Sequence, residues 1–303
     1  MPQALTARTA LLLSIPPLLW AGNSVVGRMA VGLVPPLGLN FARWALVFVL
    51  LLPLGRAALR DPAALWARKG YLGLLGLLGI GSYNALQYLA LHTSSALNAT
   101  LITASAPVWM LAIGALIYRV PPRRPELIGA ALSLLGVALV IARGAPTRLL
   151  DLQFVPGDLL MVAAIISWGF YSWLLARPPA SMRGAARPDW NWAAFLLAQT
   201  GFGLLWCAAG AGAEAAFGAA QWHFNGWVAA LIGFVAIGPG LIAFRCWGLG
   251  VGIVGPAVAS FFINLTPVFA AVMSAALLGE PPAWYHAVAF VLIAGGIVVS
   301  ARK

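Results

Sequence analysis

One block of this chain occurs twice. Residues 87–143 align with residues 247–303 without a gap, at a constant offset of 160 residues. Each copy consists of two long apolar stretches joined by a Pro-Pro turn, at Pro121-Pro122 in the first copy and at Pro281-Pro282 in the second. Duplication of an apolar unit is typical of membrane proteins that are built from internal repeats.

The composition places the chain in a membrane. Hydrophobic residues make up 62% of its 303 residues and charged residues only 8%, and the mean hydropathy is +0.93. Apolar runs of about 18 or more residues with few charges indicate membrane helices. The runs in this chain also lack the alternation of a barrel strand. The predicted fold class is therefore all-α, a polytopic membrane protein.

Ten apolar stretches are long enough to cross a bilayer, and the loops between them are too short to hold a soluble domain. We therefore expect one transmembrane domain over residues 1–303. The first stretch is read as a retained helix, because it is too long for a signal peptide and lacks a small-x-small cleavage site. The predicted spans are residues 9–31, 37–54, 70–91, 95–118, 125–142, 157–176, 191–210, 225–248, 254–278 and 283–300.

The repeat extends, more weakly, to the first span of each half. Residues 20–24 match residues 168–172 at an offset of 148. Each half then contains five spans, and because five is odd, the two halves cross the membrane in opposite senses. We predict a first five-helix repeat over residues 1–145 and an inverted five-helix repeat over residues 155–303, arranged around a central cavity.

The basic residues are distributed unevenly along this topology. With the N-terminus placed in the cytoplasm, thirteen Lys and Arg residues fall on inner loops and tails, whereas Arg28, Arg143 and Arg148 fall outside. Such a bias sets the orientation of a membrane protein. The net charge of +11 therefore favours contact with anionic membrane lipids and not with nucleic acid. Both termini are expected in the cytoplasm.

Several functions lack the residues they require. There is no GxxxxGK[ST] loop, so ATP is not expected as the direct energy source. The seven acidic residues and three histidines are scattered over loops and span ends, so we expect neither an enzyme nor a metal or other cofactor. Cys207 and Cys246 stand alone and are expected to serve packing. Lys69 and Lys303 are predicted at the inner surface, which excludes a retinal protein.

Polar and aromatic residues inside the spans mark the candidate site, because such residues are costly in a bilayer. Trp20 and Asn23 share one helical face, and Trp168 and Tyr171 share the equivalent face of the sixth span. Amides, hydroxyls and aromatic rings could hold a zwitterion, although they could also only join helices. The candidate substrate-binding residues are Trp20, Asn23, Tyr83, Asn84, Gln87, Tyr88, Asn98, Trp109, Trp168, Tyr171, Ser260 and Asn264, with Ser105 as a further possibility.

Arg43 is a cation inside the second span. It lies about seven residues, or roughly 10 Å, below the outer end of that span. It could receive a substrate carboxylate, or it could snorkel or hold a backbone carbonyl. A structural role is the favoured interpretation, and Arg43 stays a possible site residue.

Three prolines interrupt predicted helices. Pro107 and Pro267 are equivalent in the repeat, and Pro239 lies between two glycines. Proline removes a backbone donor and bends a helix. These positions could act as hinges or could impose a fixed curvature.

Short motifs follow one another along the whole chain. They are residues 18–24, Phe41-Ala-Arg43, residues 86–96 leading to Ala106-Pro107, and residues 259–267 leading to Gly279-Glu280. In these motifs the chain resembles the EamA-type, ten-helix members of the drug/metabolite transporter superfamily. Its aromatic content is similar to that of the bacterial YddG-type amino-acid exporters.

The resemblance implies ten helices around a central cavity, alternating access, small polar metabolites as substrates and a bacterial inner (plasma) membrane. The chain departs from it in having no Glu or Asp at mid-membrane, which weighs against simple proton coupling. Phosphorylated substrates would favour several buried cations and cationic drugs a buried Glu, so neutral zwitterions fit best. We expect a secondary transporter that exports amino acids, aromatic and other neutral ones. The oligomeric state stays open, with a monomer as the simplest case. A multidrug or other metabolite exporter, or a membrane enzyme acting on lipids, is the alternative.

Overall fold

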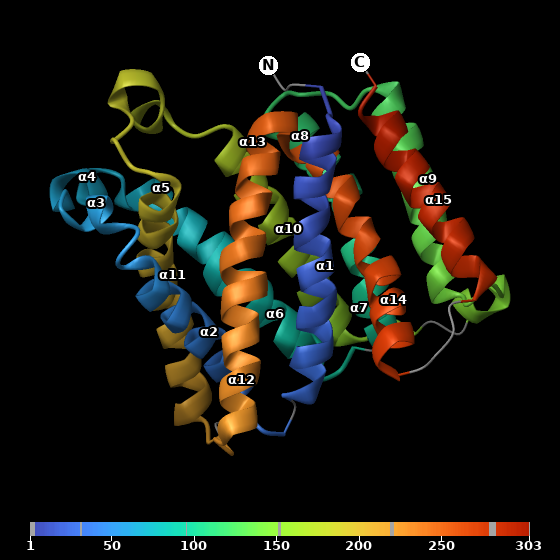
Figure 1. Cartoon of the computed structure of the whole chain (residues 1–303), viewed down its shortest axis with the longest axis horizontal. Coiled ribbons are helices and arrows are strands. Elements are labelled where there is room, and N and C mark those ends of the chain that lie inside the picture. The colour runs from blue at the N-terminus through green and yellow to red at the C-terminus, as the bar shows by residue number, and fades with distance from the viewer. Residues whose placement is uncertain are drawn as a thin grey trace.

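The computed structural model describes residues 4–30, 32–94, 96–150, 153–218, 221–278 and 283–302. Within these ranges every regular element is helical, and no β-strand occurs. The longer helices lie side by side with their axes roughly aligned (Figure 1). A bilayer core offers no water to the backbone, and helices satisfy their N–H and C=O groups internally. The predicted all-α class is confirmed.

Long apolar helices identify a multi-pass membrane protein. In the described part, four helical segments are long and apolar enough to cross a bilayer, and several shorter helices are similarly apolar. The four are Arg124–Ile141, Pro156–Ala176, Trp192–Ala216 and Gly226–Ala270.

The first half of the chain contains nine α-helices, of which α3 and α4 are short, and two other helical segments, the π-helical η1 and the 3-10 turn η2, in the described ranges. They are α1 (Ala7–Met29), α2 (Pro36–Leu51), α3 (Arg56–Leu59), α4 (Pro62–Ala67), α5 (Lys69–Leu75), η1 (Gly76–Ser82), α6 (Tyr83–Ala90), α7 (Ala96–Ala104), α8 (Ala106–Leu116), α9 (Arg124–Ile141) and η2 (Pro146–Leu149).

The second half contains a second π-helical segment, η5, and three 3-10 turns, η3, η4 and η6. Its elements are α10 (Pro156–Ala176), η3 (Ala180–Met182), η4 (Gly184–Ala186), α11 (Trp192–Ala216), α12 (Gly226–Val235), η5 (Ala236–Ile242), α13 (Ala243–Phe261), η6 (Phe262–Leu265), α14 (Thr266–Leu278) and α15 (Trp284–Ser300).

The helix bounds follow the offset found in the sequence. The π-helical segments η1 and η5 lie 160 residues apart, and so do the first residues of α6 and α13, of α8 and α14, and of α9 and α15. A π-helical turn inserts an extra residue into a helix and is frequent at functional sites. The correspondence therefore reaches upstream of residue 87, where the sequence alignment begins.

One predicted break lies elsewhere in the structure. The sequence predicts an interruption between residues 248 and 254, but helix continues through this stretch and bends at Gly255, where φ is +83°. Glycine adopts this left-handed conformation without a steric penalty. Pro256 follows it and cannot donate a backbone hydrogen bond. The chain therefore turns back at Gly255-Pro256.

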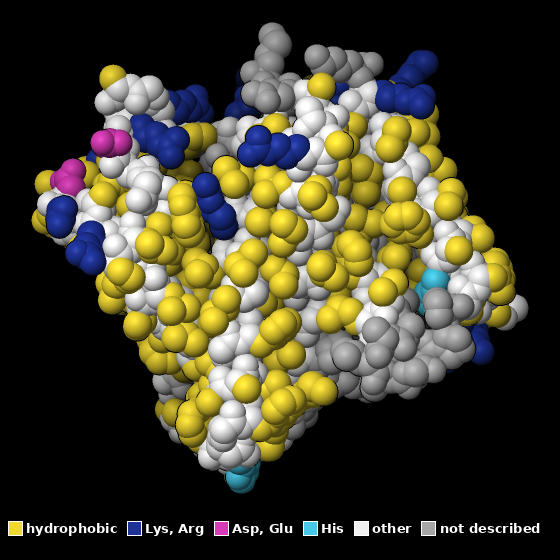
Figure 2. Space-filling view, in the orientation of Figure 1, with side chains coloured by type: hydrophobic (Ala, Val, Ile, Leu, Met, Phe, Trp, Pro, Cys, Tyr) yellow, Lys and Arg dark blue, Asp and Glu magenta, His cyan; other side chains and the backbone are white. Residues whose placement is uncertain are grey.

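Both termini lie at the same end of the bundle, which is called the N/C end below (Figure 1). On the face shown in Figure 2, most Lys and Arg side chains gather toward this end, and a broad hydrophobic surface occupies the middle. An apolar belt below a basic end suits a protein whose sides face lipid.

Helices α9 and α15 pack closely through small residues (Figure 1). A Cβ atom on Gly296 would lie 2.5 Å from Ser133 Oγ and 2.7 Å from the carbonyl oxygen of Gly129. A Cβ atom on Gly129 would lie 2.6 Å from the carbonyl oxygen of Gly296. Small residues allow this approach, which drives helix association in lipid by close packing.

We predict that Gly296→Ala destabilises the protein, because the new methyl group meets the backbone of α9. Overpacking of this kind costs about 1–3 kcal/mol. Gly295→Ala is the matched control, since a Cβ atom there has nothing within 4 Å. The thermal unfolding midpoint in detergent should fall for Gly296→Ala and stay level or rise for Gly295→Ala. Equal midpoints would contradict the close contact.

Candidate functional site

A cavity of about 790 Å³ lies at the N/C end of the bundle. Its walls come from the chain before α1, the start of α9, the end of α10 and the bend in α13. The side chains that line it include Leu5, Arg123, Glu126, Trp173, Arg177 and Val254. Its wall is therefore apolar, with two cations and one carboxylate.

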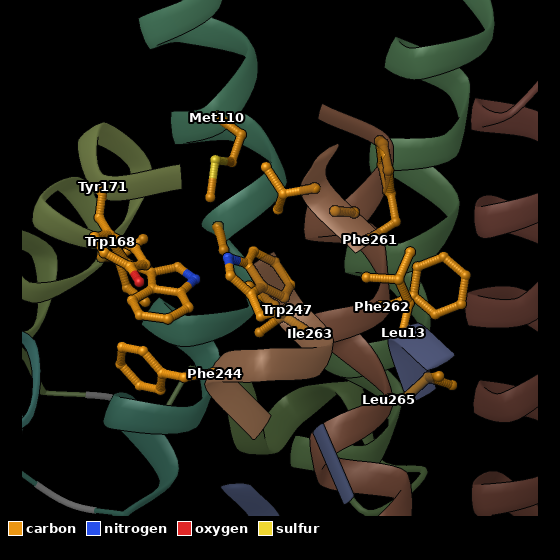
Figure 3. Packing of buried hydrophobic residues seen from close by; sticks show 14 of the residues in the cluster. Leu13, Met110, Trp168, Tyr171, Phe244, Trp247, Phe261, Phe262, Ile263 and Leu265 are labelled. Atoms are coloured by element: carbon orange, nitrogen blue, oxygen red, sulfur yellow. The ribbon is translucent and has the colours of Figure 1, made fainter. Parts of the chain in front are cut away.

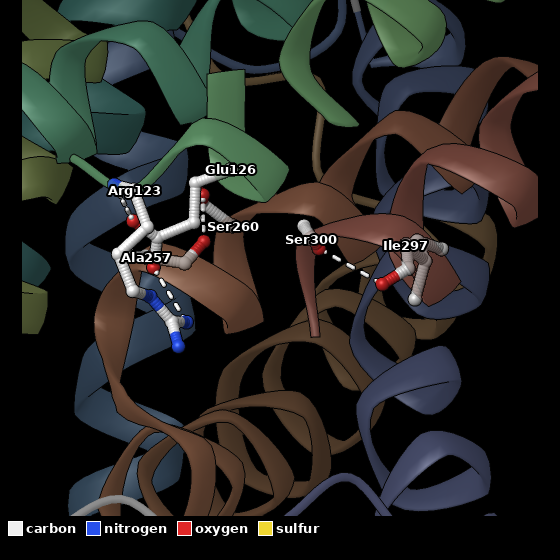
Figure 4. Close-up of polar contacts among 6 residues, drawn as sticks. All are labelled: Arg123, Glu126, Ala257, Ser260, Ile297 and Ser300. Carbon is white, nitrogen blue, oxygen red and sulfur yellow. Dashed lines mark hydrogen bonds and ion pairs between the residues drawn. The ribbon is translucent and has the colours of Figure 1, made fainter. Parts of the chain in front are cut away.

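Glu126 is held in place at the start of α9. One of its carboxylate oxygens accepts a hydrogen bond from the backbone N–H of Arg123 at 2.7 Å, and the other pairs with Arg123 Nη2 at 3.0 Å (Figure 4). The carboxylate thus caps the N-terminus of α9 and interacts favourably with the positive end of the helix dipole. His286 takes the equivalent place in α15, where its Nδ1 accepts from the backbone N–H of Ala283 at 3.0 Å.

The bend in α13 adds a backbone acceptor to the cavity wall. Gly252, Gly255 and Pro256 all line the cavity. Because Pro256 has no N–H, the carbonyl group of Gly252 lacks its usual helical partner. A broken helix of this kind presents carbonyl oxygens to an ion or a substrate.

Six aromatic side chains form a cluster deeper in the bundle than the cavity. Trp168 lies at its centre, with its ring centroid 5.0–5.4 Å from those of the other five residues, and the cluster is largely buried. Figure 3 shows Trp168, Tyr171, Phe244 and Trp247 of this cluster. Such aromatic pairs contribute about 0.5–1.5 kcal/mol each beyond their burial. This aromatic layer consists of Trp20, Tyr83, Trp168, Tyr171, Phe244 and Trp247.

The aromatic layer lies deeper in the bundle than the cavity, toward the far end. Val251 lines the cavity, and Trp247 lies about one helical turn from it on α13. Trp247 is fully buried, and its Nε1 donates to Ser172 Oγ at 3.0 Å. Ser172 Oγ itself donates to the carbonyl of Trp168 at 2.8 Å. Trp168 Nε1 is buried without a partner among the described residues.

A buried polar group follows one helical turn further on. Arg43 Nη1 donates to Asn84 Oδ1 at 2.9 Å and to Asn23 Oδ1 at 3.4 Å. Arg43 is only 1% exposed. This polar layer therefore links α2 to α1 and to α6, and its members Asn23 and Asn84 were predicted site residues.

The structure brings four of the predicted aromatic and two of the predicted amide residues together in these two layers. Phe244 and Trp247 were not predicted. The repeat does contain a signal for them, since they are equivalent to the predicted Asn84 and Gln87 at the offset of 160. Glu126 and Trp173 were missed because neither stands out from a capping or an apolar pattern. None of the twelve predicted residues lines the cavity at the N/C end.

The other predicted residues lie elsewhere. Trp109 Nε1 donates to Ser105 Oγ at 3.1 Å, so these two residues bond each other. Ser260 Oγ donates to the carbonyl of Ala257 at 2.6 Å (Figure 4). Asn264 is fully buried in η6, and neither atom of its amide has a partner in the described part of the chain.

Three further predicted positions are polar residues of the first half. Gln87 is half-buried on α6, and the buried hydroxyl of Tyr88 has no partner in the described ranges. Asn98 belongs to α7, and its side chain lies outside the described part.

The three prolines adjoin departures from α-helix. Pro107 is the second residue of α8, directly after the break at Ser105. Pro267 is the second residue of α14 and follows η6, and Pro239 lies inside η5. Each therefore marks a point where backbone geometry changes within a span.

A helical membrane bundle with a cavity at one end, and with buried aromatic and polar layers deeper inside, has the architecture of a membrane transport protein. The chain belongs to the EamA-like transporter family, whose model matches it twice, at residues 7–142 and at residues 155–302. The two matches divide the chain close to the boundary that the repeat predicts.

Two relatives extend the match over much or all of the chain. An uncharacterized transporter of Archaeoglobus fulgidus is 23% identical over 302 residues, which cover 99% of both chains. The uncharacterized transporter YyaM of Bacillus subtilis is 22% identical over 227 residues, or 75% of this chain and 71% of that protein. A solved structure described only as "Crystal structure of protein" shares the fold, with a TM-score of 0.74, 22% identity, and coverage of 97% of this chain and 96% of that one.

We predict that Ser172→Ala lowers the stability of the bundle, because it leaves the buried N–H of Trp247 without its acceptor. An unsatisfied buried donor costs about 1–3 kcal/mol. Ser300→Ala is the control, since the Ser300 hydroxyl is also fully buried but bonds the carbonyl of Ile297 on its own helix. The unfolding midpoint in detergent should fall further for Ser172→Ala, and a larger fall for Ser300→Ala would refute the proposed role of this hydrogen bond.

Proposed function

We propose that this chain is a secondary transporter that exports amino acids, aromatic and other neutral ones, by alternating access. The observation that carries the proposal is the aromatic layer, which lies between a cavity at one end and a buried polar layer. Indole and phenol rings hold an apolar or aromatic side chain by stacking. Buried amides and a guanidinium group, one turn further on, suit the polar end of the same molecule.

We propose further that ten segments cross the membrane as two inverted repeats of five. The matching helix bounds at the offset of 160 residues support this arrangement. So does the position of both termini at one end of the bundle, which requires an even number of crossings (Figure 1). The segments would be α1, α2, α5-η1-α6, α7-α8 and α9 in the first half, and α10, α11, α12-η5-α13 as far as Gly255, the rest of α13 with η6 and α14, and α15 in the second.

The bacterial inner membrane is the proposed location, with the N/C end in the cytoplasm. The Lys and Arg side chains that gather at this end support the orientation, because basic loops stay on the cytoplasmic side (Figure 2). The cavity would then open to the compartment from which an exporter takes its substrate.

Transport is proposed to proceed without direct proton coupling. The three buried carboxylates of the described residues all lie at helix ends. Glu126 caps α9, Asp158 accepts from the backbone N–H of Val155 at 2.9 Å, and Glu214 accepts from the first turn of α2. A carboxylate engaged in this way differs from the mid-membrane acid that a proton-coupled drug exporter uses, so neutral zwitterions suit this pathway better than cationic drugs.

We predict saturable uptake of aromatic and other neutral amino acids into liposomes that contain the purified protein, at a rate that a pH gradient does not change. A panel of radiolabelled amino acids, with and without the gradient, measures this. Gradient-driven uptake would contradict the uncoupled mechanism. Absence of uptake for every amino acid, by protein that keeps its unfolding midpoint, would contradict the substrate class and favour other metabolites or drugs.

Trp168 of the aromatic layer should matter for uptake, and so should the predicted site residues Trp109 and Gln87, which lie outside both layers. We predict that Trp168→Ala, Trp109→Ala and Gln87→Ala each reduce amino-acid uptake by about tenfold or more, as expected for the loss of interactions worth about 1.4 kcal/mol. Trp227→Ala is the control, because that tryptophan is 54% exposed on the surface of α12. Normal uptake by all three site variants at normal expression would refute the site assignment.

A further inference from the structure

We infer that Arg43 is the residue that receives the carboxylate group of the transported substrate, and that Asn23 and Asn84 hold its guanidinium group in place between transport events. The inference deepens the proposed function and rests on it, because it assumes a substrate with a free carboxylate.

The first reason is that Arg43 is a buried cation without a counter-ion. The described residues contain one ion pair, between Arg123 and Glu126, and Arg43 takes no part in it. Its titratable neighbours are Tyr83, Tyr88 and Cys207, a set that contains no carboxylate. A buried charge needs pairing as well as hydrogen bonds, because desolvation costs several kcal/mol per ion. Two amide oxygens, and the ring of Trp44 with its centroid 5.4 Å from the guanidinium carbon, supply only part of that compensation.

The second reason is that the other half of the chain makes the same helix contact without a charge. At the offset of 148, Tyr171 is equivalent to Asn23. Tyr171 donates through its hydroxyl group to Gln199 Oε1 at 3.2 Å, which joins α10 to α11 as the Arg43–Asn23 bond joins α2 to α1.

Contacts with the two π-helical segments identify Gln199 as the counterpart of Arg43. In the contact between α2 and η5, Val47 lies 2.9 Å from the position that a Cβ atom on Gly240 would take. In the contact between α11 and η1, Ile80 lies 2.5 Å from the position that a Cβ atom on Gly203 would take. Ile80 and Gly240 are equivalent at the offset of 160. Val47 and Gly203 are therefore counterparts. Arg43 and Gln199 each precede them by four residues, or about one helical turn. Because a neutral glutamine makes the link in one half, joining the helices does not require a cation in the other.

The third reason is that Arg43 keeps unused donor capacity beside the π-helical segment η5. Its Nε atom is buried without a partner among the described residues, and the buried hydroxyl of Tyr88 has none there either. The Nε atom lies 3.4 Å from the position of a Cβ atom on Gly240. A guanidinium group binds a carboxylate through two parallel N–H donors, for which Nε and one Nη serve well.

The position along the pathway also fits. Asn23 follows Trp20 of the aromatic layer by about one helical turn, and Asn84 directly follows Tyr83. On α13 and η5, Gly240 precedes Phe244 by four residues. An amino acid whose side chain stacks in the aromatic layer would therefore place its carboxylate near Arg43.

The test compares two ligands that differ only at the carboxylate, L-tryptophan and L-tryptophanamide, on the purified full-length protein in detergent. Binding is measured by calorimetry for the wild type, Arg43→Gln and Arg43→Lys. Arg43→Gln mimics the second half of the chain and is expected to fold, which its unfolding midpoint checks. The matched control is Arg245→Gln, because Arg245 is partly exposed and its guanidinium group lies over the ring of Trp192 at 4.6 Å.

The wild type should bind L-tryptophan more tightly than the amide, and Arg43→Gln should weaken L-tryptophan binding about 10- to 100-fold, as expected for a lost hydrogen-bonded charge pair. Binding of the amide should change little, and Arg43→Lys should restore part of the preference. An equal loss for both ligands, or no preference in the wild type, would overturn the inference and leave Arg43 a structural residue. Binding of neither ligand by folded wild type, together with absence of amino-acid uptake in liposomes, would instead defeat the proposed function. If Arg43→Gln does not fold, the ratio of the two affinities in Arg43→Lys decides.

Discussion

Polar groups inside an apolar bundle must find their hydrogen-bond partners within the protein, because the surrounding lipid offers none. Much of the structure follows from this requirement. Several buried hydroxyl groups donate to carbonyls of their own helices, as those of Ser172 and Thr200 do, and that of Ser167 donates to the carbonyl of Leu78 in η1. The carboxylates of Glu126 and Glu214 accept hydrogen bonds from backbone N–H groups at the starts of α9 and α2. Arg43 differs from these groups, because it is a buried cation whose titratable neighbours include no carboxylate.

Close approach between helices is the second constraint, and it determines where the polar groups can meet. Glycines at the α9–α15 contact bring two backbones together, and small residues in the π-helical segments do the same for α2 and α11. With these contacts made of backbone and small side chains, the large rings are left to fill the space between the halves. The rings of the aromatic layer fill such space, and Trp247 lies about one helical turn beyond Val251 of the cavity wall.

The sequence was sufficient to predict the class, the approximate helices and the duplicated pattern, because long apolar runs and a fixed offset are properties of the chain itself. It also named Trp20, Tyr83, Trp168 and Tyr171, which the structure brings together in the aromatic layer. Periodicity gives the face of a helix but not the residues opposite that face. The participation of Trp247 in the aromatic layer depends on how helices pack, and so does the position of the cavity. The predicted break differs from the observed bend at Gly255 for a similar reason, since the segment before Gly255 stays helical through its contacts.

Two copies of one unit need not keep the same chemistry, and these copies differ at the polar layer and at the cap of the last helix. The contact between the first and second helices uses Arg43 and Asn23 in one half, but Gln199 and Tyr171 in the other. The cap of the last helix is Glu126 at the N/C end and His286 in the equivalent place. Equivalent backbones can give two access routes of similar shape. A charge present in only one copy would make the site itself directional, so that a zwitterion could occupy it in one orientation, with its side chain against the rings and its carboxylate against α2.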